Sequence, residues 1–130
     1  MNYLKFSQRL RAKLPVILQD EVAECGHACI LMISNFYGHR LDMQGLRKLH
    51  QPSPHGITML QINTILNQLS LQTRALKVEL EHVKYLQTPA ILHWNLNHFI
   101  VLKKVTRKRF IVHDPVSIAR NLANISPVSL

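Results

Sequence analysis

The hydrophobic pattern of the chain changes once, at Pro89, and this change limits the available folds. Before Pro89, apolar residues recur at the spacing of three and four that is typical of helices, most clearly over residues 24–37 and 58–69. After Pro89, short runs rich in β-branched and aromatic residues indicate strands. Helices followed by strands predict an α+β fold.

The remaining elements are shorter. Asp42 and Thr58 are suitable N-caps, the first for a helix over 43–50 and the second for the helix that follows it. Residues 71–76 predict a short strand, and residues 79–85 predict a short helix. The strand-like runs after Pro89 cover residues 90–94, 98–103 and 109–113, and the last two flank a basic turn at 104–108. We therefore expect those two runs to form an antiparallel hairpin.

Length and composition favour one domain. The chain has 130 residues, of which 47% are hydrophobic, enough for a single core over residues 1–130. No apolar run approaches the ~20 residues that span a bilayer. The first residues lack the apolar stretch of a signal peptide. These features predict a soluble, cytosolic polypeptide.

The net charge of +9 comes largely from two basic groups. They comprise Lys5, Arg9, Arg11 and Lys13 near the start, and Lys103, Lys104, Arg107, Lys108 and Arg109 in the hairpin. One interpretation is an anionic partner, either a membrane surface or nucleic acid. The other is a solvated face and a charged hairpin that resists edge-to-edge pairing. We favour the second, since few aromatic residues interleave with the charges to stack on bases.

Cys25 is the candidate nucleophile because it falls in the first turn of the first predicted helix. The partial positive charge of a helix N-terminus stabilises a thiolate, and Gly26 permits close approach of the backbone. A free cysteine can also be a small buried apolar residue, which is our interpretation of Cys29. Spacing of four on one helix is poor disulfide geometry, so we expect two reduced thiols. A metal pair is the weaker alternative, as no second ligand cluster is present.

Three further residues could complete a peptidase site around Cys25. His98 begins a predicted strand and could act as general base, while Asp114 ends the antiparallel neighbour and could orient the imidazole. Gln19 precedes Cys25 by six residues and could donate to an oxyanion, together with the Cys25 backbone N–H. The alternative to a catalytic role is an ordinary turn aspartate for Asp114 and a solvated loop glutamine for Gln19. We expect the other histidines to be packing or surface residues.

The same residues carry a resemblance to a known family. The first motif is Gln19-x5-Cys25-Gly26-x-Ala28-Cys29, the second is Trp94-Asn95-x-Asn97-His98-Phe99, and the third is His113-Asp114-Pro115. In this order, they resemble the peptidase C39 family, and more narrowly the N-terminal peptidase domain of bacteriocin and colicin V-type ABC exporters. The match runs from about residue 15 to residue 115.

The resemblance implies a papain-like fold, with a helical half that carries the cysteine and an antiparallel sheet that carries the histidine and the aspartate. It implies cleavage of an exported peptide after a double-glycine leader, with Cys25 as nucleophile, His98 as base, Asp114 as orienter and Gln19 in the oxyanion hole. The partners implied are the precursor peptide and the membrane and ATPase domains of the same transporter. The expected location is the cytoplasmic face of a bacterial inner membrane.

The resemblance also implies that the 130 residues are excised from a longer protein, a homodimeric transporter, while the isolated domain is expected to be monomeric. Peptide hydrolysis itself needs no metal or nucleotide, and ATP is expected only in the missing ATPase domain. Val116 and the residues after it lack the glycine that the family commonly has there. The family also continues with a further helix and a closing strand, whereas this chain ends at Leu130. We therefore expect the last sheet edge to be absent or differently built.

Two other function classes remain open. Some relatives in toxin secretion systems lack the cysteine and only dock their substrate, so a non-catalytic docking domain is the main alternative. It predicts an unreactive Cys25. A small basic nucleic-acid binder is the weaker one, and it predicts DNA affinity that falls steeply with salt.

Overall fold

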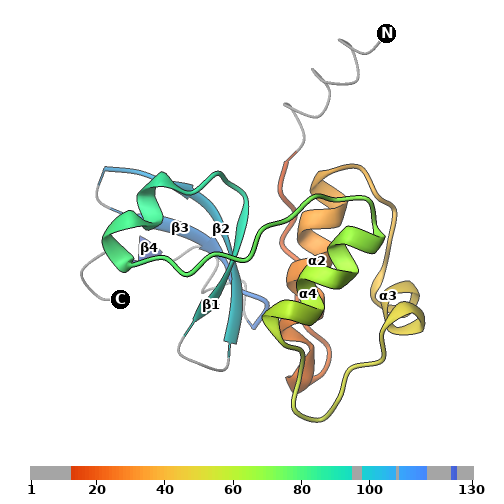
Figure 1. The fold of residues 1–130 in the computed structure, drawn as a ribbon. Coiled ribbons are helices and arrows are strands. Elements are labelled where there is room, and N and C mark those ends of the chain that lie inside the picture. The colour runs from red at the N-terminus through yellow and green to blue at the C-terminus, as the bar shows by residue number, and fades with distance from the viewer. Residues whose placement is uncertain (1–12, 95–97, 108, 117–123, 126–130) are drawn as a thin grey trace, which may run out of the picture.

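The computed structural model describes residues 13–94, 98–107, 109–116 and 124–125. These residues form a helical half and a sheet half that lie side by side (Figure 1). The helical elements are η1 (Val22–Glu24), α2 (Cys25–Phe36), α3 (Met43–Leu49), α4 (Met59–Gln68) and η2 (Leu80–Tyr85), and the strands are β1 (Ala90–Trp94), β2 (His98–Val105), β3 (Phe110–His113) and β4 (Asn124–Ile125). The predicted α+β class is confirmed.

Helix α2 is the centre of the helical half and follows the predicted bounds closely. It ends where Gly38 adopts a positive φ of 96°, a conformation that costs glycine little. The Asp42 side chain caps α3 by accepting from the Gly45 N–H, and the Thr58 side chain caps α4 by accepting from the Gln61 N–H. Both predicted caps are confirmed.

The sheet is antiparallel, in the order β1-β2-β3-β4. β2 and β3 form the predicted hairpin, with Val101 opposite His113 and a register shift between Leu102 and Lys104. The predicted basic turn is shorter than expected, because β2 continues to Val105 and the Thr106 N–H donates to the Arg109 carbonyl at 2.9 Å. Of the predicted turn, Lys108 lies outside the described residues.

Two hydrophobic clusters cover the two faces of the sheet. Side chains of α2, α3 and α4 pack with Phe99 and Val101 of β2 in the first cluster. In the second, Val83 of η2 packs on the alternate residues Ile100 and Leu102. The period-two alternation of β2 thus joins both layers, and α2 lies directly against this strand.

The structure corrects the prediction for residues 71–76, which form no strand. This segment is an extended link between α4 and η2, and it has no ladder partner in the described ranges. The Thr73 hydroxyl instead donates to the side chains of Asn63 and Asn67, so the link is attached to α4. The predicted helix over 79–85 exists as the 3-10 helix η2.

The last sheet edge, which was expected to be absent or differently built, is formed by β4, which pairs with β3. The pairing involves only two residues, which is too short a run for any periodicity to show.

The extended segment before Gln19 ties the two halves together. Leu14 is buried in the cluster around α2, while the Pro15 carbonyl lies 3.0 Å from His113 Nδ1 at the end of β3. The Gln19 N–H donates to the Pro115 carbonyl at 2.9 Å. None of the helices in the described ranges combines the length and the apolar composition that crossing a bilayer requires. The first 12 residues, with most of the N-terminal basic group, lie outside the described part.

Candidate active site

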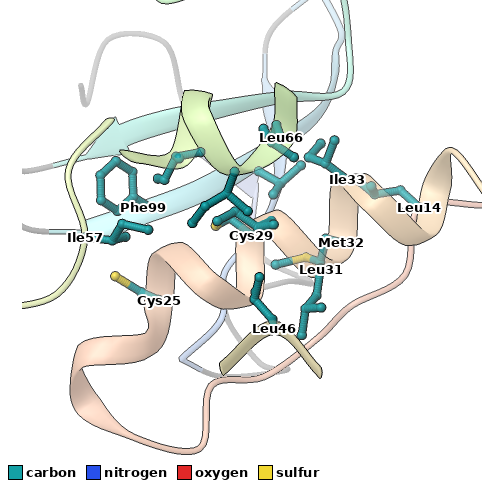
Figure 2. Close-up of a cluster of buried hydrophobic side chains, with 14 residues drawn as sticks. Leu14, Cys25, Cys29, Leu31, Met32, Ile33, Leu46, Ile57, Leu66 and Phe99 are labelled. Atoms are coloured by element: carbon teal, nitrogen blue, oxygen red, sulfur yellow. The ribbon is translucent and has the colours of Figure 1, made fainter. Parts of the chain in front are cut away.

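Cys25 is the first residue of α2, and its thiol lies where the helical half meets the sheet. Figure 2 shows its side chain at the start of the helix, beside Ile57 and Phe99. Cys25 is nearly buried, and both cysteines are free, as expected. Cys29, one turn later, is 0% exposed, and burial raises the pKa of its thiol well above the usual range. The structure therefore gives the two thiols different environments.

His98 and Asp114 form a hydrogen-bonded pair at the adjacent strand ends. His98 Nε2 lies 2.7 Å from Asp114 Oδ1, and the same oxygen accepts from the Val116 N–H at 2.9 Å. Antiparallel pairing of β2 with β3 brings the first residue of one strand beside the residue that follows the other. Because Nε2 bonds to the carboxylate, Nδ1 is the ring nitrogen left for the thiol of Cys25.

The thiol and the imidazole shift each other's proton affinity. Burial raises the pKa of the Cys25 thiol, but hydrogen bonds with the His98 side chain and the Phe99 backbone outweigh it, so the net pKa is lowered. The hydrogen bond with Cys25 raises the pKa of His98, burial opposes this, and Asp114 raises the pKa further. The two directions together favour a thiolate beside an imidazolium.

Gln19 lies at the same end of the sheet, but its amide already has partners. Its Nε2 donates to the carbonyls of Glu21 and Val22, at 3.1 Å each. Its Oε1 is buried and has no hydrogen-bond partner among the described residues. The structure thus brings Cys25, His98 and Asp114 together, with His98 hydrogen-bonded to Asp114 and electrostatically coupled to the Cys25 thiol. It places Gln19 at the same end of the sheet, with its amide N–H groups on the carbonyls of Glu21 and Val22.

Gly26 allows the start of α2 to approach the neighbouring loop closely. A Cβ at this position would lie 2.2 Å from Ile57 Cγ2 and 3.3 Å from Phe99 Cδ2. Real Cβ atoms do not come so near a neighbour, so any larger residue would force either the Ile57 side chain or the first turn of α2 to shift. The prediction that Gly26 serves close packing is confirmed.

Two contacts at the site were not predicted from the sequence. One is the Phe99 backbone N–H, which no side-chain pattern could reveal. The other is the bidentate ion pair between Glu24, directly before Cys25, and Arg47 of α3. A glutamate before the cysteine was visible in the sequence, but nothing there pointed to its partner 23 residues later. Among the described residues, no group of three or more potential ligands could hold a metal ion.

Comparison with known proteins identifies the family. The sequence profile of the peptidase C39 family matches residues 13–128, which is most of the chain. This chain belongs to the peptidase C39 family. The colicin V secretion/processing ATP-binding protein CvaB of Escherichia coli is 45% identical over 118 residues, which are 91% of this chain and 16% of that protein.

Two more relatives extend the comparison. The probable microcin-H47 secretion/processing ATP-binding protein MchF of Escherichia coli is 43% identical over 111 residues, 85% of this chain and 16% of that protein. The crystal structure of a double glycine motif protease from an AMS/PCAT transporter, in complex with the leader peptide, is 30% identical with a TM-score of 0.77, covering 88% of this chain and 79% of that one.

The peptidase domain of Streptococcus ComA has a TM-score of 0.78 at 24% identity, over 90% of this chain and 89% of that one, and it supports the fold. The fold of this C39 chain is therefore the papain-like one expected. The chain spans about a sixth of the length of the transporters CvaB and MchF, at 16% of each.

Proposed function

We propose that this C39 domain is a cysteine endopeptidase that removes the double-glycine leader of an exported peptide. The observation that carries the proposal is that His98 is hydrogen-bonded to Asp114 and, together with the Cys25 thiol, shifts both pKa values toward a thiolate and an imidazolium. A base held between a thiol and a carboxylate is the arrangement that thiol acyl transfer requires. The relative with a bound leader peptide has the same fold.

In the proposed mechanism, the Cys25 thiolate attacks the carbonyl of the second leader glycine, and a covalent acyl-enzyme forms as the C–N bond breaks. His98 gives its proton to the leaving amine. It then takes a proton from water, which attacks the acyl carbon, releases the leader and restores the Cys25 thiolate beside the His98 imidazolium. Asp114 holds the imidazole in one orientation throughout.

The proposed oxyanion donors are the Cys25 backbone N–H and the Gln19 amide. Since Gln19 Nε2 donates to the carbonyls of Glu21 and Val22, it would have to give up or share one of these bonds to bind the oxyanion. We further propose that hydrolysis needs neither metal nor nucleotide, because the thiolate, the imidazole and the amide donors supply the nucleophile, the proton and the charge stabilisation.

The partners that we propose follow from the relatives. CvaB and MchF are named as secretion/processing ATP-binding proteins, and this chain matches a small part of each. We therefore propose that the domain, monomeric by itself, works within a homodimeric ABC transporter that supplies the membrane and ATPase domains. Its place would be the cytoplasmic face of a bacterial inner membrane, where the precursor peptide is available.

The test is mass spectrometry of a double-glycine precursor peptide after incubation with the domain. We expect cleavage after the second glycine by the parent, and a fall of about 10²-fold or more for His98→Ala, the range for general acid–base groups. Cys25→Ala should abolish cleavage. EDTA and the omission of ATP should leave the rate unchanged.

A docking domain without activity predicts a different result. The peptide would bind both the parent and Cys25→Ala, and neither would cleave it. Cleavage that persists in Cys25→Ala would contradict the proposed nucleophile, and cleavage lost in EDTA would contradict metal-independent hydrolysis.

A further inference from the structure

A buried carboxylate lies directly before the nucleophile and has no role in the chemistry above. The Glu24 side chain is 1% exposed. Arg47 Nε donates to its Oε2 at 2.6 Å, and Arg47 Nη2 donates to its Oε1 at 2.8 Å. The backbone N–H of Glu21 also donates to Oε1, at 3.1 Å. The carboxylate is thus held by α3 on one side and by the turn before η1 on the other.

The Glu24–Arg47 pair lies at the N-cap position of α2, where a side chain usually caps the helix. Glu24 is the N-cap residue of α2, yet its side chain makes no capping hydrogen bond. Its Oε2 accepts from Arg47 of α3, and its Oε1 accepts both from Arg47 and from the Glu21 N–H, within a capping box of η1. Helix α3 is itself anchored by Leu46, which is fully buried in the α2 cluster. The residue directly before Cys25 is therefore held by a contact to a different helix.

The geometry of the Glu24–Arg47 pair fixes the orientation of the two side chains more than it stabilises the folded state. A planar guanidinium that donates two parallel bonds fixes both the distance and the angle of a carboxylate. Burying such a pair often adds little net stability over apolar side chains, because desolvation offsets the attraction. The hydrogen bond from Arg47 lowers the pKa of Glu24, so the carboxylate stays charged and paired at neutral pH.

We propose that Glu24 and Arg47 are positioning residues that hold the first turn of α2 so that the Cys25 thiol stays in hydrogen-bonding contact with His98. The thiol and the imidazole come from different halves of the molecule, so a small shift of this turn separates them. Misplacement by about 1 Å can cost 10²-fold in rate. The inference rests on the roles proposed above for Cys25 and His98.

The test measures the pH profile of Cys25 alkylation by iodoacetamide, with the modified cysteine identified by mass spectrometry. The variants are Glu24→Gln and Arg47→Gln. Matched controls are Asp20→Asn, an exposed carboxylate 3.3 Å from the same guanidinium, and Lys48→Gln, the exposed neighbour of Arg47 on α3. Cys29 serves as an internal reporter of unfolding, since it is 0% exposed.

We expect the midpoint of Cys25 alkylation to rise by about one pH unit in both variants, which is a tenfold lower rate below the midpoint. Cys29 should stay protected, and both controls should match the parent. Profiles of both variants that coincide with the parent would overturn the proposal. So would alkylation of Cys29 as fast as Cys25, because the pair would then support the fold as a whole.

Peptide cleavage by the same proteins separates this proposal from the proposed function. We expect kcat to fall by about tenfold to 10²-fold, with KM within twofold of the parent, because neither residue is placed against the substrate. A parent that cleaves nothing would contradict the peptidase function, while the alkylation profiles would still decide the positioning role.

Discussion

Among single residues, His98 is the group that links Cys25 to Asp114 in the candidate site. Its Nε2 is hydrogen-bonded to Asp114, which leaves Nδ1 for the thiol of Cys25, and the Cys25 side chain raises the pKa of His98. The proposed peptidase activity requires the thiolate and the imidazolium together. The rate should therefore rise with pH as Cys25 loses its proton, below the usual thiol range, and fall as His98 loses its own, above the usual imidazole pKa.

The rate of cleavage should thus have a bell-shaped dependence on pH. Asp114→Asn should shift the alkaline limb of this profile to lower pH. An amide keeps the shape of the side chain but removes the charge that raises the pKa of His98, so the imidazolium loses its proton at lower pH. We expect kcat/KM at pH 7.5 to fall on the order of 10²-fold, and the alkaline limb to move down. The measurement is the cleavage rate from pH 5 to pH 9. An unchanged alkaline limb would show that the carboxylate charge has no part in setting it.

At the scale of elements, the start of α2 is the most tightly packed point beside the site. Gly26→Ala would place a Cβ 2.2 Å from Ile57 Cγ2, and we expect a loss of about 1–3 kcal/mol in the free energy of unfolding. Urea unfolding measures this loss. Cleavage should fall as well, because Cys25 is the adjacent residue.

Ile57→Ala provides the matched test of the clash. Alone, it removes a buried side chain at a cost of about 2–5 kcal/mol. Combined with Gly26→Ala, the total loss should be smaller than the sum, since alanine at 57 makes room for the new Cβ. If the two losses in the free energy of unfolding are additive, the destabilisation by Gly26→Ala does not come from its contact with Ile57.

Most elements were predictable because their signals are local. Apolar spacing and the caps Asp42 and Thr58 placed α3 and α4, and β-rich runs placed the hairpin. The strand predicted over 71–76 was wrong, because apolar alternation does not reveal whether a ladder partner exists. Residues of the candidate site were found through their motifs, whereas the Glu24–Arg47 contact depends on how α3 packs and leaves no local signal.

At the scale of the whole molecule, two buried histidines make stability depend on pH. Burial lowers the pKa of His27 and of His113, the second of which bonds to the Pro15 carbonyl of the segment that joins the halves. A lowered folded-state pKa gives stability that is fully present above the unfolded pKa and is lost as pH falls. His98 has the opposite shift, so its effect on the slope lies above pH 6.5.

The free energy of unfolding should therefore decrease below about pH 6.5, by at most ~1.4 kcal/mol per pH unit for each of the two histidines. His27→Gln with His113→Asn keeps a donor near each lost ring nitrogen and should flatten the slope. Urea unfolding at pH 7 and pH 5 measures it as a single transition if, as we propose, the chain folds as one domain. His55→Gln, at an exposed position, is the matched control. An equal slope in the parent and the double variant would contradict this origin.

The division of the site between two halves has a consequence for the order of synthesis. Cys25 leaves the ribosome long before His98 and Asp114, and until the sheet has formed it has no imidazole beside it. A nascent chain therefore carries an ordinary thiol, with the reactivity of any exposed cysteine. In the proposed mechanism, the reactive thiolate therefore forms only when β2 docks on α2, so completion of the fold itself would serve as the activation step.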